Sequence, residues 1–316
     1  MLIEPLILEP MESTTQSIEA SSKRKKLWLA ALKPPMYSVA IMPILVGSLV
    51  AFADTQVLQV GIFLTFLMSA ILILAWENVC NDVFDSATGI DVNKHHSLVN
   101  LTQKKQLVFA IGNGCLGLGI VGIISIALQQ QDPTVLLLIL LCCLLGYAYQ
   151  GPPFRLGYQG LGEILCFFAF GPLGVGAAYY SQTQSWSVGS QVAGIIIGIT
   201  TSLVLFCSHF HQVEDDIAAG KRSPIVRLGT QRGAQLIPWL CGLVLVLILG
   251  AAIAGYLPLW SLLALLSSIS AIRLSLQALT YHDQPAKIFN LKFYAIGFHF
   301  WSGMLLSLGL VLPSVL

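Results

Sequence analysis

Residues 57–76 read VLQVGIFLTFLMSAILILAW, without a single charged side chain, and residues 81–91, shortly after them, read NDVFDSATGID. An uncharged apolar run of about twenty residues is long enough to cross the hydrocarbon core of a bilayer as an α-helix. The aspartates that follow at positions 82, 85 and 91 are unusual in a chain with so little charge. The two stretches together predict a membrane helix that ends in a polar site.

The composition of the whole chain is that of a membrane protein. Of its 316 residues, 56% are hydrophobic and 10% are charged, and the mean hydropathy is +0.79. A soluble domain carries about 25% charged residues. Because backbone groups in lipid must find their hydrogen bonds internally, such long apolar segments are helices. We expect an all-α polytopic membrane protein with nine transmembrane helices, at 28–52, 57–76, 106–129, 134–150, 161–180, 187–210, 235–255, 258–280 and 291–312.

The basic residues are distributed asymmetrically over this predicted topology. All 16 Lys and Arg residues fall on one side: before the first span, in the connections after spans two, four, six and eight, or, for Lys33 and Arg273, near span ends on that side. An excess of Lys and Arg marks the cytoplasmic side of a membrane protein, so we expect a cytoplasmic N-terminus and a C-terminus on the other side. Residues 1–22 lack the pattern of a signal peptide. They are expected to form a disordered cytoplasmic tail ahead of a transmembrane domain at 23–316.

The first acidic cluster lies where the second span would continue as a helix beyond the bilayer. Its polar residues have the spacing i, i+3, i+4 and i+7, which places them on one side of a helix: Asn78, Asn81, Asp82 and Asp85. Mg²⁺ favours one or two carboxylates together with waters and phosphate oxygens. The pattern indicates either a Mg²⁺ site or a solvated helix end with capping aspartates.

The second acidic cluster lies in residues 209–229, which read HFHQVEDDIAAGKRSPIVRLG. On a continuous helix, His209, Gln212 and Asp216 would share one face, with Asp215 next to it. This end of the sixth span is therefore a second candidate for holding a metal ion.

Two cations follow this cluster directly. Gly220 is expected to end the helix, and Lys221 and Arg222 come next. Carboxylates for a metal beside two cations for an anion are what a metal–diphosphate complex requires. The alternative is a basic cytoplasmic loop that obeys the positive-inside rule.

A third polar stretch runs from Tyr147 to Gly171 and reads YAYQGPPFRLGYQGLGEILCFFAFG. Arg155 is its one cation and is either a topology signal or a partner for a diphosphate. Tyr149 and its aromatic neighbours are either interfacial belt residues or ring faces that stabilise a carbocation.

These motifs resemble those of the UbiA superfamily of intramembrane prenyltransferases, over essentially the whole sequence. The family's first signature, N-D-x-x-D followed by a further Asp, is matched by Asn81, Asp82, Asp85 and Asp91. More narrowly, the chain resembles the MenA-type branch, which prenylates 1,4-dihydroxy-2-naphthoate. The stretches that carry this resemblance are LKPPMYSVAIMPILVG, which includes Lys33, then NDVFDSATGID, YQGLGE and DIAAGKRSPIVRLG.

The chain departs from the family in its second motif. The usual D-x-x-x-D reads Gln212 to Asp216 here, so an amide stands where a carboxylate is expected. Asp215 or Glu214 is then a further candidate ligand of a second metal ion.

The resemblance implies Mg²⁺-dependent transfer of a phytyl or geranylgeranyl group from its diphosphate to the naphthoate, with loss of CO₂, as in phylloquinone synthesis. It implies a multi-pass protein of a cytoplasmic, inner or thylakoid membrane whose active site faces the cytoplasm; no nucleic-acid partner is expected. The implied metal ligands are Asn81, Asp82, Asp85, Asp91, Asp215 and Asp216. The implied catalytic residues are Asp82, Asp85, Asp216, Lys221 and Arg222. The implied substrate-binding residues are Asn78, Asn81, Lys33, Arg155, Tyr149, Gln212 and His209.

Other functions are compatible with parts of the pattern. The same chemistry on another acceptor, such as homogentisate or 4-hydroxybenzoate, is not excluded by any single residue. The D-G-x-x-A-R pattern of CDP-alcohol phosphotransferases is absent. A cation-coupled transporter would also hold intramembrane carboxylates, but near the midplane of the bilayer and not at one rim.

Overall fold

The computed structural model describes residues 25–90 and 97–314, and their regular structure is helical throughout. The longer helices are α2 (Ser38–Thr55), α3 (Val60–Asp85), α5 (Lys105–Gln130), α6 (Thr134–Gln150), α7 (Gly162–Phe168), α8 (Gly174–Thr183), α9 (Val188–Ser208), α12 (Thr230–Ile253), α13 (Ser268–Tyr281) and α15 (Leu291–Val311). Short helices lie between them: η1 (Pro34–Tyr37), α4 (Leu98–Thr102), η2 (Leu156–Gln159), η3 (Ala169–Leu173), η4 (His209–His211), α10 (Val213–Ala218), α11 (Pro224–Leu228), η5 (Leu259–Ser267), α14 (Pro285–Ile288) and η6 (Leu312–Ser314).

The chain is an integral, multi-pass membrane protein. Among the described residues, eight helical segments are long and apolar enough to cross a membrane: Lys25–Thr55, Val60–Asp85, Lys105–Gln130, Gly162–Thr183, Val188–His211, Thr230–Ile253, Leu259–Tyr281 and Pro285–Val311. The predicted fourth span, 134–150, is also a helix, but it has 17 residues and falls short of that length. Pro133 precedes it and Gly151, in an extended conformation, ends it. The all-α fold is confirmed, and the predicted count of nine spans is corrected to eight candidates and one shorter apolar helix.

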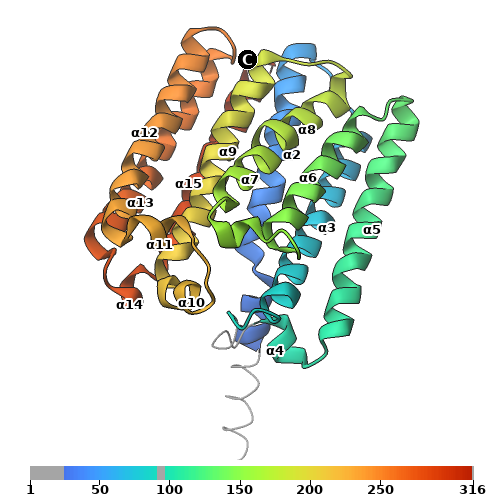
Figure 1. Ribbon diagram of the computed structural model, residues 1–316. Helices are drawn as coiled ribbons and strands as arrows, with labels where there is room; N and C mark the ends of the chain where they lie inside the picture. Colours follow the sequence, from blue (N-terminus) through green and yellow to red (C-terminus); the bar gives the residue numbers. More distant parts are fainter. Residues whose placement is uncertain (1–24, 91–96, 315–316) are drawn as a thin grey trace, which may run out of the picture.

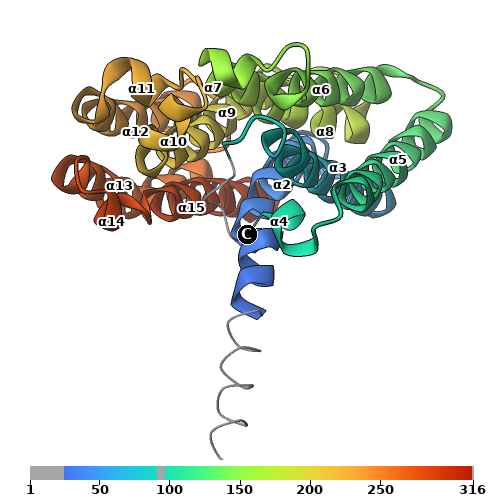
Figure 2. The ribbon, with the colours of Figure 1, turned by 60° about the horizontal axis from the view of Figure 1, so that its bottom comes forward.

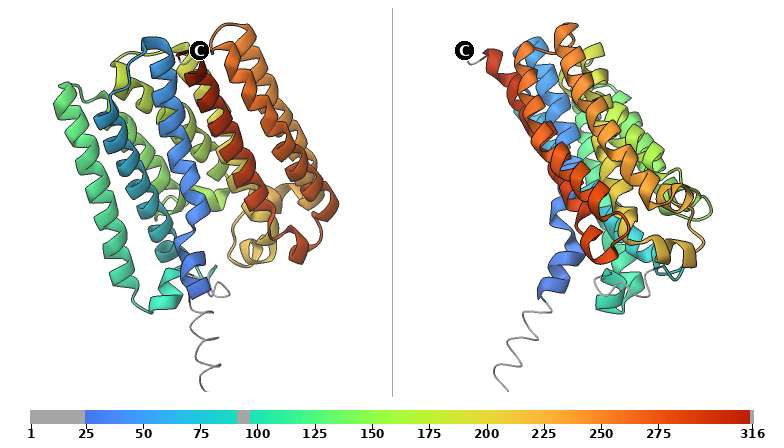
Figure 3. Two further views of the ribbon diagram at one scale, coloured as in Figure 1. Left: turned by 180° about the vertical axis from the view of Figure 1, so that it is seen from behind. Right: turned by 90° about the vertical axis from the view of Figure 1, so that its left-hand side faces the viewer.

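The long helices run side by side and form one bundle (Figure 1). Seen toward one end, they form two rows, with α13, α15, α2, α3 and α5 in one row and α12, α9, α7 and α6 in the other (Figure 2). Helix α2 packs between α3 and α15 and also contacts α8 and α9 (Figure 3). It therefore connects the two rows through the middle of the bundle.

The short helices α4, α10, α11 and α14 all lie at one end of the bundle, whereas α15 ends near the other end (Figure 1). The connections that contain these short helices carry many of the basic residues of the chain. The positions of these basic residues thus agree with the charge asymmetry predicted from the sequence. Asp91 and the predicted tail at 1–22 lie outside the described residues.

Two helices are interrupted where the sequence contains proline. The first membrane segment breaks at Lys33, whose φ is 49°, and η1 begins at Pro34 and Pro35. Proline lacks the backbone N–H that a continuous helix needs, and it pushes the preceding residue out of the helical region. The second break is at Gly171, where Pro172 follows and the backbone leaves helical geometry. A Cβ on Gly171 would lie 2.6 Å from the carbonyl oxygen of Gly194, so the missing side chain lets η3 approach α9 closely.

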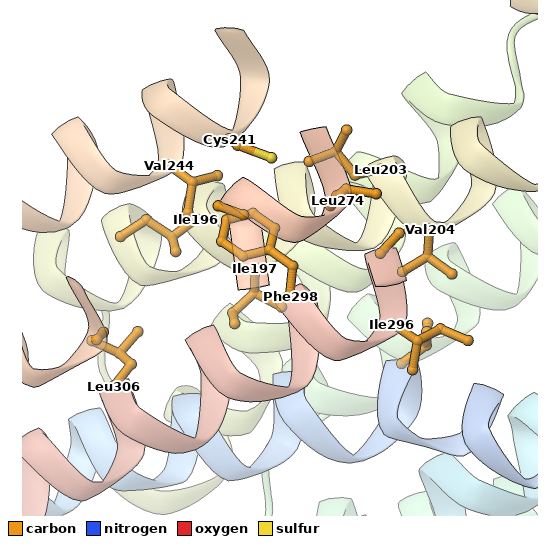
Figure 4. Close-up of a cluster of buried hydrophobic side chains, with 14 of the residues drawn as sticks. Ile196, Ile197, Leu203, Val204, Cys241, Val244, Leu274, Ile296, Phe298 and Leu306 are labelled. Carbon is orange, nitrogen blue, oxygen red and sulfur yellow. The ribbon is translucent and has the colours of Figure 1, made fainter. Parts of the chain in front are cut away.

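The interior of the bundle is packed with aliphatic side chains. One cluster joins α9, α12, α13 and α15 around Phe298, which is fully buried together with Ile197 and Leu274 (Figure 4). A second cluster joins α3, α5 and α6 around Phe66. Because lipid tails are as apolar as these side chains, membrane helices associate through close packing contacts. Members of both clusters, such as Ile296 and Phe66, also line the cavity that is described next.

Candidate active site

A cavity of about 920 Å³ lies between the helices. We call it the bundle cavity. Polar residues from several parts of the chain line it, among them Lys33; Glu77, Asn78, Asn81 and Asp85; Tyr149, Gln150 and Tyr158; His209, His211, Gln212, Asp215 and Lys221; and Lys292. Apolar residues line the rest, among them Val39, Ile44, Phe66, Ile139, Leu165, Phe170 and Ile296. The cavity therefore has a charged region and an apolar region, which a single amphipathic ligand could occupy together.

The first acidic cluster is held by a single continuous helix, as predicted. Helix α3 extends to Asp85, and Asn78, Asn81 and Asp85 line the bundle cavity. Asp82 does not line it. Its carboxylate is fully buried and accepts a hydrogen bond of 2.9 Å from the backbone N–H of Leu98.

Lys33 is the counter-charge of Asp82. Its Nζ lies 3.3 Å from Asp82 Oδ1 and donates a hydrogen bond to it. The break in the helix at Lys33 brings this side chain over the end of α3, where it also lines the cavity. A buried carboxylate is stable only when it is paired or hydrogen-bonded, and Asp82 has both kinds of partner.

Asp85 is held by the loop that follows α6. The hydroxyl of Tyr158 donates a hydrogen bond of 2.9 Å to Asp85 Oδ1, and the hydroxyl groups of Tyr158 and Thr88 lie 2.7 Å apart. Burial of its ring and the nearby charge of Asp85 raise the pKa of Tyr158. The phenol therefore stays protonated and can orient the carboxylate.

The second acidic cluster is not on one continuous helix, which corrects the sequence-based expectation. A 3₁₀ turn, His209–His211, follows α9, and Gln212 leaves helical geometry at φ −116° before α10 begins at Val213. The break turns α10 so that Gln212 and Asp215 line the bundle cavity. Glu214 is exposed and does not line it.

Despite this break, the predicted neighbours come together around Asp216. Asp216 is fully buried, with Oδ2 3.2 Å from His209 Nδ1 and Oδ1 3.3 Å from Lys221 Nζ. On the far side of the imidazole, His209 Nε2 lies 3.4 Å from Glu163 Oε1. The contacts of Asp216 with His209 and Lys221, and of Glu163 with His209, are close but lack hydrogen-bond alignment. Burial by itself would raise the pKa of Asp216, but His209 and the charge of Lys221 outweigh burial and lower it.

Two predicted cations lie outside the cavity lining. Arg222 is exposed, and its backbone N–H donates a hydrogen bond of 2.8 Å to the carbonyl oxygen of Tyr158. Arg155 does not line the cavity, and its Nε is buried without a hydrogen-bond partner. Of the predicted substrate-binding residues, the structure brings Asn78, Asn81, Lys33, Tyr149, Gln212 and His209 to the cavity.

Several polar residues of the lining were not among the predicted site residues: Tyr158 and His211, and also Glu77, Gln150 and Lys292. Glu77 belongs to α3 and lies four residues before Asn81, so the helical spacing was a signal for it. Gln150 ends α6, and Lys292 lies at the start of α15. The sequence offered no signal for Gln150, whereas Lys292 was counted as a topology charge.

The lining suits a hard cation bound together with a ligand. Among the described residues, no three His, Cys, Asp or Glu side chains are grouped as a metal site. Mg²⁺ does not need such a cage, since it keeps several waters and uses one or two carboxylates with substrate phosphates. Asp85 on α3, Asp215 on α10 and Asn81 line the cavity and are the hard oxygen groups that could hold such a cation.

The fold and the cavity thus define a polytopic helical membrane protein with an acidic and basic pocket that continues into an apolar chamber. The UbiA prenyltransferase family model matches residues 40–303 of the chain. A protein of Synechocystis sp. named 2-carboxy-1,4-naphthoquinone phytyltransferase is 51% identical over 299 residues, which are 94% of this chain and 97% of that protein. A chloroplastic protein of the same name from Arabidopsis thaliana is 41% identical over 93% of this chain and 79% of its own length.

A solved structure has the same fold. It is that of a UbiA homolog from Archaeoglobus fulgidus bound to GPP and Mg²⁺, with a TM-score of 0.53 and 17% identity over 89% of this chain and 99% of that one. The chain belongs to the UbiA prenyltransferase family.

Proposed function

We propose that this chain transfers a phytyl group from its diphosphate to 1,4-dihydroxy-2-naphthoate, the reduced form of 2-carboxy-1,4-naphthoquinone, with loss of CO₂ in phylloquinone synthesis. The observation that carries the proposal is the bundle cavity, where Asp85 and Asp215 meet Lys33 and Lys221 beside apolar walls. A relative of that named activity, 51% identical over nearly the whole chain, supports the choice of substrates.

The diphosphate head of the donor fits the charged region. Lys33 and Lys221 line the cavity and donate N–H groups, while the buried carboxylates of Asp82 and Asp216 hold them in place. Mg²⁺ bound by Asn81, Asp85 and Asp215 would neutralise the diphosphate and stabilise the leaving oxygen. The lysines add donors that are already oriented before negative charge develops on that oxygen.

The hydrocarbon tail of the donor fits the apolar region. Side chains such as Phe66, Ile139 and Phe170 line it and hold the tail away from water. Exclusion of water protects the allylic cation that forms when the C1–O bond breaks. The rings of Tyr149 and Trp76 line the same cavity and present π faces that stabilise a cation.

The acceptor completes the reaction as the nucleophile. Its electron-rich ring attacks C1 of the allylic cation, and loss of the carboxylate as CO₂ restores the quinol. Lys292 lines the cavity from α15, where its Nζ lies over the rings of Phe289 and Phe293.

The orientation in the membrane follows from the charge asymmetry. The connections that carry many of the basic residues lie at one end of the bundle, so that end faces the cytoplasm. The relative from Arabidopsis thaliana is chloroplastic, which favours a thylakoid membrane for the phytyl-transferring enzyme.

The test is direct product analysis with purified protein in detergent. The protein is supplied with 1,4-dihydroxy-2-naphthoate, Mg²⁺ and either phytyl or geranylgeranyl diphosphate, and the prenylated product and CO₂ are followed by mass spectrometry. We expect product that requires Mg²⁺ and that is lost in Asp85→Asn. The matched control is Asp54→Asn. Asp54 lies at the C-terminal end of α2, outside the cavity lining, and accepts a hydrogen bond from the hydroxyl of Tyr179. Turnover of homogentisate but not of the naphthoate would overturn the acceptor, and no turnover of any diphosphate would overturn the proposal.

A further inference from the structure

Glu77 is a carboxyl group that the site described above does not use. It lies on α3, eight residues before Asp85, and lines the bundle cavity. Eight residues of helix correspond to about 12 Å along the axis. It also lies one helical turn from Asn81, on the side that faces away from the end of α3 at Asp85.

The carboxyl group of Glu77 is not neutralised by a neighbouring cation. Its Oε2 is buried and has no hydrogen-bond partner, and within the described residues Glu77 forms no ion pair. Of the lysines that line the cavity, Lys33 lies against Asp82 and Lys221 against Asp216. Ionisable groups inside membrane segments are costly and usually functional, so Glu77 needs an explanation.

Helix α6 is adapted to this side chain. A Cβ on Gly146 would lie 2.6 Å from Glu77 Oε2, so the carboxyl group fits there because the residue opposite has no side chain. One turn further along α6, Gln150 Nε2 donates a hydrogen bond of 3.0 Å to the backbone carbonyl of Glu77. Gln150 Oε1 is also buried without a partner. Glu77 and Gln150, joined by this bond, thus each bring one unpartnered acceptor oxygen to the cavity lining.

These surroundings select the kind of group that Glu77 binds. A diphosphate is excluded, since two anions without a cation between them repel each other. The adjoining lining, Trp76, Cys142, Cys143 and Tyr149, suits the flat face of an aromatic ring. A ring hydroxyl, which donates a hydrogen bond, complements both unpartnered oxygens.

We propose that Glu77 is the base that binds a ring hydroxyl of the aromatic acceptor and takes its proton as the ring attacks the allylic cation. This inference rests on the proposed function. A carboxylate away from water and from cations is a better proton acceptor than one in bulk solvent. Gln150 positions the acceptor beside it.

The proton and the electrons balance over the whole step. Glu77 takes the hydroxyl proton, and the electron pair of the O–H bond moves through the ring to form the new C–C bond at the carbon that carries the carboxylate. The C1–O electrons of the donor leave with the diphosphate. The resulting β-keto carboxylate loses CO₂, its electron pair returns to the ring, and Glu77 gives the proton back to the ring oxygen.

The experiment compares Glu77→Gln and Glu77→Asp with the wild-type enzyme, using 1,4-dihydroxy-2-naphthoate, phytyl diphosphate and Mg²⁺. We expect Glu77→Gln to lower kcat by about 100-fold or more, the usual contribution of a general base, and Glu77→Asp to recover part of it. The KM for phytyl diphosphate and the rise in Tm on adding its thiodiphosphate analogue with Mg²⁺ should not change, because Glu77 does not touch the donor. Asp132→Asn is the matched control, since Asp132 accepts a hydrogen bond from Tyr180 away from the cavity lining.

Two results would overturn the inference. One is a kcat of Glu77→Gln within about threefold of wild type, because a base cannot be replaced by an amide at so small a cost. The other is loss of donor binding in step with kcat, which would make Glu77 a structural residue of the whole site. A wild-type enzyme that prenylates no naphthoate fails at an earlier stage and refutes the proposed function itself.

Discussion

Lys33 Nζ lies 3.3 Å from Asp82 Oδ1, and the distance between Lys221 Nζ and Asp216 Oδ1 is the same. In both pairs the carboxylate is fully buried, and the lysine reaches the bundle cavity. The two acidic clusters, far apart in the sequence, therefore use the same device. In each cluster, one aspartate is buried outside the cavity lining and pairs with a lysine that lines the cavity. A neighbouring aspartate, Asp85 or Asp215, lines the cavity itself.

Replacing Lys221 tests this device. Removing one partner of a buried pair leaves an uncompensated charge at a cost of about 3–5 kcal/mol; because the side chain of Lys221 is 10% exposed, we expect the lower part of that range. Lys221→Ala should lower the Tm and raise the KM for the prenyl diphosphate, whereas Lys221→Arg should keep most of the stability. Lys287→Ala is the control, as Lys287 lies over the ring of Tyr281. An unchanged Tm and donor KM in Lys221→Ala would refute the role of the pair.

Tyr158→Phe tests how Asp85 is oriented. The substitution removes the hydrogen bond from the phenol to Asp85 Oδ1 and leaves the ring in place. One hydrogen bond of this kind contributes about 0.5–1.5 kcal/mol, so kcat/KM should fall by about threefold to tenfold. Tyr147→Phe is matched to it, because the hydroxyl of Tyr147 bonds the carbonyl oxygen of Pro152 and not a site residue. Equal effects of the two substitutions on kcat/KM would contradict the assignment.

Helix α3 shows how much of the site could be predicted from the sequence. The uncharged run at 57–76 predicted a membrane helix, and α3 is that helix. The spacing of Asn78, Asn81 and Asp85 predicted that their side chains share one face, and all three line the cavity. Periodicity is reliable here because the helix is unbroken to its last residue. Helical periodicity could not predict that the side chain of Asp82 pairs with Lys33. That contact depends on the interruption of the first helix at Lys33, 49 residues earlier in the sequence.

The second cluster shows where periodicity fails. A helix from His209 to Asp216 was expected, but the backbone leaves helical geometry at Gln212. His209 and Asp216 are still in contact, because the turn at Gln212 folds α10 back so that the two side chains meet. Contacts of this kind depend on how separate elements pack, and no local spacing encodes them.

Gly160→Ala should disturb the loop that carries the cations of the second cluster. Gly160 has φ +75°, and a Cβ there would collide with the carbonyl oxygen of Arg222. Gly220 has φ +70°, with nothing within 4 Å of the same Cβ. Gly220→Ala should therefore cost only backbone strain of about 1 kcal/mol. Gly160→Ala should in addition push away the backbone at Arg222, directly after Lys221.

Thermal unfolding and the KM for the prenyl diphosphate separate these two glycine variants. We expect Gly160→Ala to lower the Tm more than Gly220→Ala and to raise the donor KM, which Gly220→Ala should leave near the wild-type value. The reverse order would show that the contact between the two loops does not position Lys221.

Asp215 and Glu214 offer the sharpest test of the second metal-binding position, because they are adjacent carboxylates on α10. Asp215 lines the bundle cavity, whereas Glu214 is exposed. Gln212 presents an amide at the position where a carboxylate was expected, so Asp215 is the carboxylate of this helix that lines the cavity. We expect Asp215→Asn to raise the Mg²⁺ concentration needed for half-maximal activity by about tenfold, in line with losing one carboxylate ligand of a hard cation, and Glu214→Gln to have no such effect.

Chelation of Mg²⁺ should abolish turnover in the wild type, and a titration with Mg²⁺ at fixed prenyl diphosphate gives the comparison. Equal Mg²⁺ requirements in the two variants would mean that α10 contributes no metal ligand and that the first cluster binds the metal with the substrate alone.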